Sequence, residues 1–203
     1  DRSYSRRILL SEQLTGAGFN ELLNNSLSSE AYYEGLTSCP ADKLVQLVNP
    51  LSGELNILRQ TLLFGGLSAI SRNLRRQQKS FYYYEWGNCY AAAPEVERST
   101  ATTLAGYRET QSLGLWIAGS RVQSSWAHAD EATSPFELKA HVLHLLERLG
   151  VSERSLRAEF IECDLFAGRA YRYATYDGKP IALLGQVSSA LLSKWDIDTP
   201  VYY

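Results

Sequence analysis

The 203-residue sequence contains no methionine, although a complete translated chain begins with one. The absence predicts a processed chain, an excised fragment, or a sequence written without its modified residues. Long apolar runs are also missing. The N-terminal segment reaches only three consecutive apolar residues, Ile8 to Leu10, whereas a membrane span requires ~18. We therefore expect neither a membrane-spanning segment nor a signal peptide.

Cysteine is scarce and unpaired in its spacing. Cys39, Cys89 and Cys163 are odd in number, lie far apart and form no Cys-x-x-Cys pair. This pattern argues against both a disulfide framework and a zinc-binding motif. A reducing compartment is the simpler interpretation, so we expect a cytoplasmic protein.

Charge of either sign is also unremarkable, because 20 basic and 22 acidic residues give a formal net charge of −2. A near-neutral chain argues against a surface coated with basic residues for nucleic acid, although a local patch remains compatible with it. Hydrophobic residues make up 45% of the chain and charged residues 21%, which excludes a disordered or collagen-like protein. No repeat or linker interrupts the sequence, so residues 1–203 are expected to form a single domain.

Apolar periodicity predicts four helices and a set of mainly antiparallel strands, which is an α+β pattern. Ser134 and Pro135 open the clearest helix, and Asp177-Gly178 is the strongest hairpin signal. Residues 91–111 show no period and are expected to form a long loop. The helices are expected at 2–15, 61–78, 135–149 and 189–195. The strands are expected at 21–27, 44–48, 81–90, 112–121, 156–160, 169–176, 179–187 and 199–203.

No sequence motif identifies a catalytic or metal site. Glu137, His141 and His144 share one face of the predicted third helix, but a metal site needs a further ligand, and none is evident. His128 is more simply interpreted as a hydrogen-bonded residue of a loop than as a catalytic acid or base. We therefore assign no catalytic, cofactor-binding or metal-binding residue to this chain.

One electrostatic feature is distinctive. Between Glu54 and Glu85 no acidic residue occurs, and cations gather towards the end of the predicted 61–78 helix. A solvated helix end with a favourable dipole interaction explains this group adequately. The alternative is a contact with RNA phosphates or with an acidic partner surface. The residues concerned are Arg72, Arg75, Arg76 and Lys79.

Several short sequence motifs, taken in order, resemble the catalytic-like module of the bacterial phenylalanyl-tRNA synthetase beta subunit. The likeness covers nearly the whole chain. The combination of motifs is specific, although each motif alone is weak evidence. The motifs are Gly18-Phe19-Asn20-Glu21, Asn25-Ser26-Leu27, Asn49-Pro50-Leu51-Ser52, Leu58-Arg59-Gln60-Thr61-Leu62-Leu63, Arg72-Asn73-Leu74, Glu85-Trp86-Gly87 and Phe136-Glu137-Leu138-Lys139.

The resemblance implies a class II aminoacyl-tRNA synthetase-like fold, an antiparallel sheet flanked by helices. It also implies a non-catalytic role, because in that family the active site lies in the alpha subunit. A working class II site needs an arginine near the motif-2 strand to grip the ATP α-phosphate. Residues 81–94 contain none. A second arginine is expected after a Gly-x-Gly pair, but Gly185 lacks the second glycine and only Lys194 follows.

The same resemblance implies an assembly role within a longer, multi-domain beta subunit. The partner would be the catalytic alpha subunit in an alpha2-beta2 tetramer, and the whole enzyme would use ATP, magnesium and tRNA(Phe). No cofactor is expected on this module itself. The less favoured alternatives are tRNA contact through the Arg72–Lys79 segment and an independent ATP-using synthetase paralogue. The motif-1 position implies an interface formed by Arg6, Leu9, Leu10, Leu14 and Phe19.

Overall fold

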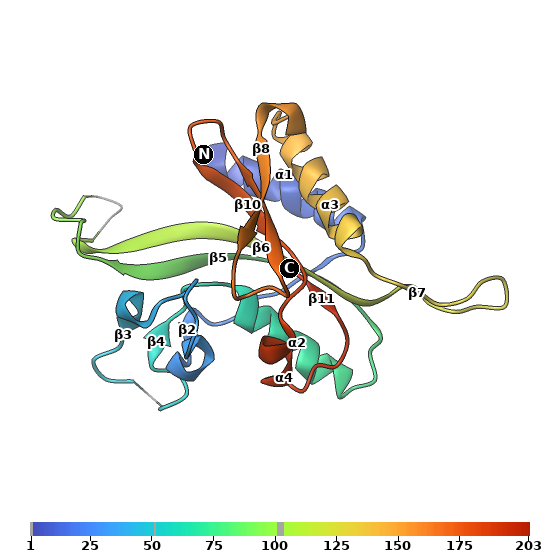
Figure 1. The fold of residues 1–203 in the computed structure, drawn as a ribbon, viewed down its shortest axis with the longest axis horizontal. Coiled ribbons are helices and arrows are strands. Elements are labelled where there is room, and N and C mark those ends of the chain that lie inside the picture. The colour runs from blue at the N-terminus through green and yellow to red at the C-terminus, as the bar shows by residue number, and fades with distance from the viewer. Residues whose placement is uncertain (1, 51, 101–103) are drawn as a thin grey trace. The chain divides into compact units, whose positions relative to one another are not determined.

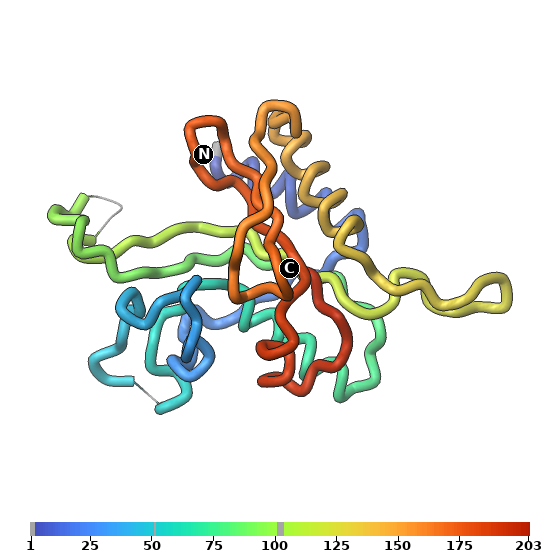
Figure 2. The backbone as a smooth tube through the Cα atoms, in the orientation of Figure 1, coloured from blue at the N-terminus to red at the C-terminus, as the bar shows by residue number. Residues whose placement is uncertain are grey.

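The computed structural model describes residues 2–50, 52–100 and 104–203. The described residues form two compact units. Unit 1 is drawn from Asp1–Glu21, Ala69–Tyr84 and Leu115–Tyr203, and unit 2 from Leu22–Ser68 and Glu85–Gly114. Helices and mainly antiparallel strands are mixed along the chain (Figures 1 and 2), which confirms the predicted α+β class.

The main sheet of unit 1 has the strand order β1-β5-β6-β11, and β7 also pairs with β6. β1 runs parallel to β5, with Asn20 opposite Tyr83, whereas β11 runs antiparallel to β6, with Val201 opposite Ala118. The strands are β1 (Asn20–Glu21), β5 (Ser80–Ala93), β6 (Gly106–Val122), β7 (Glu131–Ala132) and β11 (Val201–Tyr202).

Helix α3 (Pro135–Arg148) begins as its sequence predicts. The Ser134 Oγ accepts the backbone N–H of Glu137 at 3.3 Å, which satisfies one of the unpaired donors of the first turn. Leu138 and Leu145 form the buried face of the helix. Gly150 follows the helix with φ +79°, a conformation that glycine adopts without steric cost.

Helix α1 (Arg2–Gly16) is also confirmed, and it packs against α3. Leu10 and Leu14 lie one turn apart and are buried. The chain turns away at Gly18, whose φ is +90°, and the N–H of Phe19 then donates to the carbonyl of Leu14 at 3.0 Å. This bond closes the helix end and directs Phe19 into the interior.

A second sheet of unit 1 is built from the predicted hairpin. β8 (Arg157–Glu162), β9 (Arg169–Ala174) and β10 (Pro180–Leu184) pair antiparallel in the order β10-β9-β8. Gly178 takes φ +88° in the turn, and the N–H of Thr175 donates to the carbonyl of Lys179 at 2.9 Å. The Asp177-Gly178 signal therefore identified this hairpin correctly.

The predicted loop over residues 91–111 is wrong in its extent. β5 continues to Ala93 and β6 already begins at Gly106, so the two strands form a longer arm than expected. The N–H of Gly106 donates to the carbonyl of Val96 at 2.8 Å, which closes the connection. Side chains along this arm are mostly part-exposed on both faces, so the apolar alternation that predicts a strand is weak there.

In unit 2, the strand predicted for residues 21–27 is broken. Glu21 ends β1, and the chain then enters β2 (Leu27–Ser28), which belongs to a different sheet of order β2-β4-β3. The interruption arises because the Asn25 Oδ1 accepts the N–H of Leu27 at 3.0 Å, a local bond that competes with strand pairing. The other strands are β3 (Val45–Gln46) and β4 (Ile57–Leu58).

Helix α2 (Leu63–Leu74) starts where Thr61 predicts, because the Thr61 Oγ1 accepts the N–H of Leu63 at 3.2 Å. It ends four residues before the expected Gln78. The chain leaves the helix in a tight turn in which Gln77 adopts φ +64° and its N–H donates to the Leu74 carbonyl. The remaining short helices are α4 (Ser189–Ser193), η1 (Glu30–Tyr33), η2 (Ala41–Lys43) and η3 (Glu153–Ser155).

Gly119 is a position where β6 tolerates no side chain. Its φ is +76°, and a Cβ atom there would lie 2.0 Å from the backbone carbonyl oxygen of Lys79. We predict that Gly119→Ala lowers the free energy of unfolding by about 2 kcal/mol or more, because backbone rather than a flexible side chain must move. Urea denaturation measures the change.

Gly16→Ala is the matched control, because a Cβ atom at Gly16 meets open space. Alanine at the end of α1 is expected to leave stability unchanged or to raise it by up to about 1 kcal/mol. Equal stability of the two variants would contradict the steric account of Gly119.

Candidate functional site

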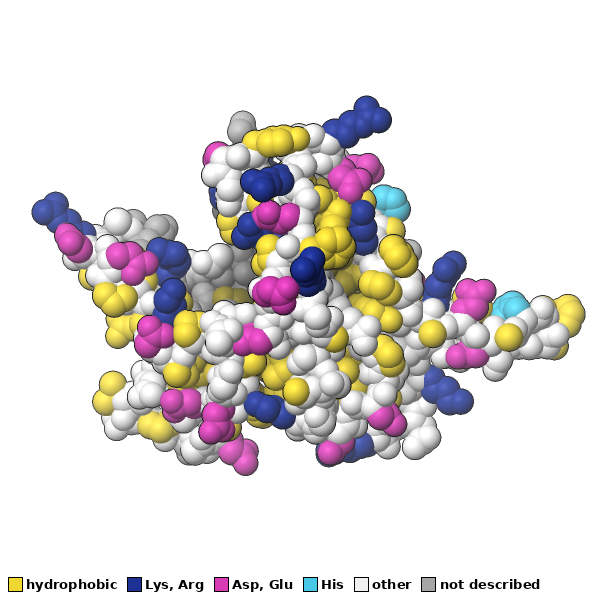
Figure 3. All heavy atoms as spheres, viewed as in Figure 1, with side chains coloured by type: hydrophobic (Ala, Val, Ile, Leu, Met, Phe, Trp, Pro, Cys, Tyr) yellow, Lys and Arg dark blue, Asp and Glu magenta, His cyan; other side chains and the backbone are white. Residues whose placement is uncertain are grey.

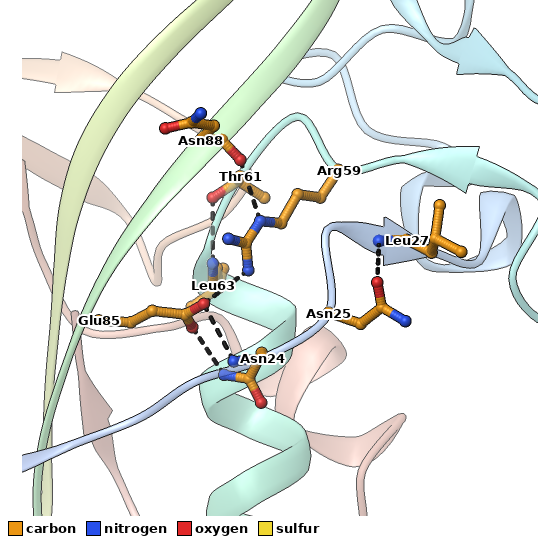
Figure 4. Close-up of polar contacts among 8 residues, drawn as sticks. All are labelled: Asn24, Asn25, Leu27, Arg59, Thr61, Leu63, Glu85 and Asn88. Carbon is orange, nitrogen blue, oxygen red and sulfur yellow. Dashed lines mark hydrogen bonds and ion pairs between the residues drawn. The ribbon is translucent and has the colours of Figure 1, made fainter.

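A buried ion pair lies in unit 2, between the residue that follows β4 and the middle of β5. The Arg59 Nη1 lies 2.7 Å from the Glu85 Oε1, and the two side chains are 7% and 1% exposed. Asn24 adds two bonds to the same carboxylate: its Nδ2 donates to Oε2 at 2.6 Å and its backbone N–H to Oε1 at 3.2 Å. Figure 4 shows the carboxylate held between Arg59 and Asn24.

The guanidinium of Arg59 has a further partner on β5. Its Nε donates to the backbone carbonyl of Asn88 at 3.0 Å (Figure 4), and the Arg59 carbonyl accepts the N–H of Tyr90 at 2.8 Å. Arg59 therefore joins the β4–α2 connection to β5 through both its side chain and its backbone. We call Asn24, Arg59 and Glu85 the buried polar cluster.

Two glycines leave room for this cluster. A Cβ atom on Gly87 would lie 2.1 Å from the Arg59 Nη2, and one on Gly65 would lie 2.9 Å from the Asn24 Nδ2. A side chain at either position would therefore displace a hydrogen-bonded side chain of the cluster. These contacts give a physical reason for Gly65 shortly after the Leu58–Leu63 motif and for Gly87 at the end of the Glu85-Trp86-Gly87 motif.

The buried polar cluster bears directly on phosphate binding. Arg59 lies beside β5, the strand where the sequence resemblance implies that a working site would need an arginine, but Glu85 neutralises its charge and the protein covers its guanidinium. A phosphate would have to displace Glu85 and lose its own hydration, which is energetically costly. In this conformation Arg59 therefore stabilises the fold and is not available to bind a phosphate.

The second predicted phosphate position is likewise filled by packing. A Cβ atom on Gly185 would lie 2.8 Å from the Phe166 ring. The N–H of Gly185 donates to the Tyr203 carbonyl and the N–H of Tyr203 to the Gly185 carbonyl, both at 3.0 Å. Gly185 therefore serves a strand pairing and an aromatic contact, while Lys194 lies exposed after α4.

The residues predicted for a subunit interface divide into two sets. Leu10, Leu14 and Phe19 are 4%, 1% and 2% exposed, so they belong to the core of the chain itself and offer little surface to a partner. Arg6 is exposed and Leu9 is half-buried. The accessible apolar surface of α1 also includes two side chains outside the predicted interface set, namely Tyr4 and Ile8.

Two open grooves run beside α1, both within unit 1. The first, about 670 Å³, lies between α1 and α3. Its lining residues are Leu9, Glu12, Gln13, His144, Glu147 and Arg148. The second, about 610 Å³, lies along the part of α1 that carries Tyr4 and Ile8 and reaches Glu21 of β1. Both grooves combine apolar and charged side chains, as partner surfaces of proteins do.

An aromatic and polar group covers the inner side of α3. The Phe19 ring meets the rings of Tyr82 and His141 edge-on, with centroids 5.4 and 4.9 Å apart. The Tyr82 hydroxyl donates to the Glu137 Oε1 at 2.7 Å. Burial lowers the pKa of His141, against an opposing effect of the Glu137 carboxylate. His141 and Glu137 thus make packing contacts, and the described residues contain no His, Cys, Asp and Glu cluster suited to a metal ion.

The four predicted cationic contacts are all exposed in unit 1, but they do not share one helix. Arg72 lies in the last turn of α2, whereas Arg75, Arg76 and Lys79 follow it in the turn that leads to β5. The Arg75 Nη2 lies 3.0 Å from the Asp196 Oδ2, and both side chains are mostly solvent-exposed. Figure 3 shows charges of both signs interspersed on the face in view.

The buried polar cluster is not among the predicted site residues. Arg59 and Glu85 both lie in motifs that carry the family resemblance, and Glu85 is the first acidic residue after Glu54. That spacing was an available signal, because a cation in a stretch without acidic residues must find its partner at a distance along the chain.

The helices of the described residues include none long and apolar enough to cross a bilayer.

Comparison with known proteins agrees with the geometry. A family model described as the phenylalanyl tRNA synthetase beta chain CLM domain matches residues 1–203. The chain is 49% identical to the phenylalanine–tRNA ligase beta subunit of Porphyromonas gingivalis and 46% identical to that of Bacteroides fragilis, in both cases over 203 residues. It spans 24% of the length of each of these relatives.

Among solved structures, the chain is similar to PylSc, a pyrrolysyl-tRNA synthetase from Desulfitobacterium hafniense. The TM-score is 0.66 at 19% sequence identity, and the match covers 98% of this chain and 62% of the other. A second pyrrolysyl-tRNA synthetase structure from the same organism gives 0.65 at 18% identity, covering 98% of this chain and 64% of that one. At such identities the likeness establishes the fold, which confirms the expected class II synthetase-like architecture.

Breaking the buried polar cluster should be far more damaging than breaking an exposed ion pair. We predict that Glu85→Ala lowers the free energy of unfolding by about 3–5 kcal/mol, because it leaves the Arg59 charge buried without a partner. Arg75→Ala, which removes the exposed pair with Asp196, should change it by less than about 1 kcal/mol. Chemical denaturation of the purified variants measures both values.

The double variant Arg59→Met with Glu85→Leu separates charge from packing. It should recover much of the loss, because it removes both charges together and keeps apolar volume. A double variant as unstable as Glu85→Ala would show that the cluster acts through shape rather than through its charges.

Stability should also depend on His141. Because burial lowers its pKa below the ordinary value of 6.5, the unfolded chain takes up a proton more readily than the folded chain. The contribution of the neutral ring is therefore present above that pH and is lost as the pH falls through it. We predict that His141→Gln flattens the fall in stability between about pH 7.5 and about pH 5. A slope that is the same in His141→Gln as in the parent chain would contradict this prediction.

Proposed function

Since the chain belongs to the family of phenylalanyl-tRNA synthetase beta chain CLM domains, as its sequence resemblance predicted, we propose that it is a non-catalytic assembly module of phenylalanine–tRNA ligase. It would pair with the catalytic alpha subunit, which activates phenylalanine with ATP and charges tRNA(Phe). The observation that carries the proposal is the burial of Arg59 against Glu85. An adenylate-forming site needs an available cation beside β5, and this chain uses its neighbouring arginine to hold the fold together.

The whole enzyme's properties are proposals too, because the chain spans only about a quarter of its curated relatives. ATP and magnesium would serve the alpha subunit, and an alpha2-beta2 assembly would act on tRNA in the cytoplasm. The catalytic step would require no cofactor on the module itself. We also propose that residues 1–203 are one module, since α2, β5 and β6 each continue without a break from one unit into the other.

The proposed surface for the alpha subunit is the accessible side of α1. Arg6, Leu9, Tyr4 and Ile8 would contact the partner, while Leu10, Leu14 and Phe19 would support the helix from inside. Exposed apolar side chains on a helix flanked by two grooves favour a protein partner, because burying them would stabilise the complex by about 25 cal/mol for each Å².

Contact of the cationic group with tRNA is the second candidate. Arg72, Arg75, Arg76 and Lys79 are exposed, and within the described residues Arg75 alone of the four forms an ion pair. Such cations can neutralise phosphates and release counterions. The same side chains would equally suit an acidic surface of the alpha subunit, and salt dependence with RNA separates the two.

The assembly proposal predicts a stable complex and no independent chemistry. Light scattering of the chain mixed with the alpha subunit at micromolar concentration should show a mass above that of either component. Pyrophosphate exchange by the chain alone, with phenylalanine and ATP, should stay at the background rate. Ile8→Asp should weaken the complex, whereas Ser3→Asp on the same helix serves as its control. Measurable exchange by the chain alone would overturn the non-catalytic assignment.

The RNA candidate predicts an affinity for tRNA that falls steeply with salt. Charge reversal in Arg75→Glu with Arg76→Glu should weaken binding and reduce the slope of log K against log salt by about 2 or more, since each phosphate that a cation neutralises adds roughly 0.9 to that slope. Unchanged affinity and slope would remove tRNA binding through this segment and leave the acidic partner surface as its role.

A further inference from the structure

A narrow finger extends from the main sheet of unit 1 between β6 and β7. It consists of residues 123–130 and leads through β7 into α3. In Figure 1 it is the yellow loop beside the β7 label, and Figure 2 shows the same yellow loop reaching well beyond the strands that carry it. All of its side chains are exposed. The sequence predicts a loop here, with His128 as one of its hydrogen-bonded residues.

The finger is held in a defined shape. Near its tip, the N–H of Ser125 donates to the carbonyl of His128 at 3.0 Å and the N–H of Ala127 to the Ser125 Oγ at 3.2 Å. At its base, the Ser120 Oγ donates to the Asp130 Oδ2 at 3.0 Å, and Val122 pairs with Glu131 across the strands. A loop fixed in this way loses less conformational entropy when it docks.

The tip presents a tryptophan that is not buried by any residue that the structure describes. Trp126 is 100% exposed, whereas Trp116 and Trp195 are 0% and 7% exposed. A second large aromatic residue, Phe136, is 80% exposed in the first turn of α3, six residues beyond the finger. Tryptophan is among the residues most enriched at the energetic centres of protein interfaces, where it fills a desolvated pocket.

The charges around the finger favour a protein over a nucleic acid. Residues 121–131 contain one arginine and two carboxylates, Asp130 and Glu131. Exposed carboxylates at the base of the finger that carries Trp126 would repel phosphates, whereas platforms that stack on bases are surrounded by cations. An apolar pocket rimmed by basic or neutral groups complements this arrangement.

Size argues that the finger adds to a larger interface. One tryptophan side chain buries about 250 Å² at most, whereas a specific interface buries roughly 1,200 Å² or more. The finger alone would hold neither a second copy of the chain nor an independent partner. It suits a partner that another surface of the chain already binds, such as the surface proposed on α1.

We propose that the finger is a docking element whose Trp126 inserts into an apolar pocket of the alpha subunit, with Phe136 contacting the rim. This inference rests on the proposed assembly function and extends it to a second contact surface. The partner's pocket is expected to be apolar within and to carry cations where Asp130 and Glu131 approach. Docking at both surfaces would fix the orientation of the partner as well as its affinity.

The experiment measures binding of the whole chain to the alpha subunit by biolayer interferometry. Trp126→Ala should raise the dissociation constant by about 30-fold or more, as expected for an interface hot spot. Gln123→Ala, on the same finger, is the matched control and should change it by less than about 2-fold. Because Trp126 is fully exposed, its variant should unfold at the same urea concentration as the parent chain.

Acrylamide quenching of tryptophan fluorescence gives a second readout that needs no loss of binding. The quenchable signal that disappears in Trp126→Phe belongs to Trp126, and it should be protected when the alpha subunit is added. Protection by tRNA alone, or by raising the concentration of the chain alone, would overturn the proposal in favour of RNA or of a second copy.

The outcomes also separate this inference from the assembly proposal. If the parent chain binds the alpha subunit and Trp126→Ala binds equally well, the docking finger is wrong and the assembly role stands. If the parent chain does not bind the alpha subunit at all, the assembly role fails and the finger's proposed partner fails with it.

Discussion

The ion pair between Arg59 and Glu85 is the constraint to which the surrounding structure of unit 2 is fitted. Two opposite charges removed from water must satisfy one another almost completely, because an unpaired buried charge costs on the order of several kcal/mol. Asn24 donates a further hydrogen bond to the carboxylate, and a backbone carbonyl of β5 accepts one from the guanidinium. Glycines occupy the positions where side chains would clash with the cluster. The β4–α2 connection, the segment after β1 and the strand β5 are thereby fixed to one another.

Local rules predicted the elements whose causes are local. Ser134 with Pro135 located the start of α3, and Asp177-Gly178 located the hairpin, because caps and tight turns are decided by neighbouring residues. The failures have a different origin. The strand expected over residues 21–27 is interrupted by an asparagine bond and by a change of sheet, and the β5–β6 arm lacks apolar alternation because it is half-exposed on both faces.

The candidate site was predictable in part for the same reason. The motifs that carry the family resemblance include Arg59, Glu85 and Phe19. The bonded members of the buried polar cluster, however, lie 26 to 61 residues apart in the sequence, and helical or strand periodicity does not predict contacts over such separations. The motif-1 resemblance placed Leu10 and Leu14 at an interface, but both turn inward, whereas Tyr4 and Ile8, which it did not include, remain outside. A helical stripe indicates that residues share a face; it does not indicate whether the covering surface belongs to the same chain.

Gly87 gives this arrangement an evolutionary consequence. Any side chain at this position, an arginine included, would collide with the guanidinium of Arg59 before it could reach a ligand. Acquiring a cation there by point mutation would therefore pass through an intermediate that folds poorly, unless Arg59 and Glu85 changed first. The packing around Gly87 therefore makes the gain of a side chain at this point of β5 unfavourable.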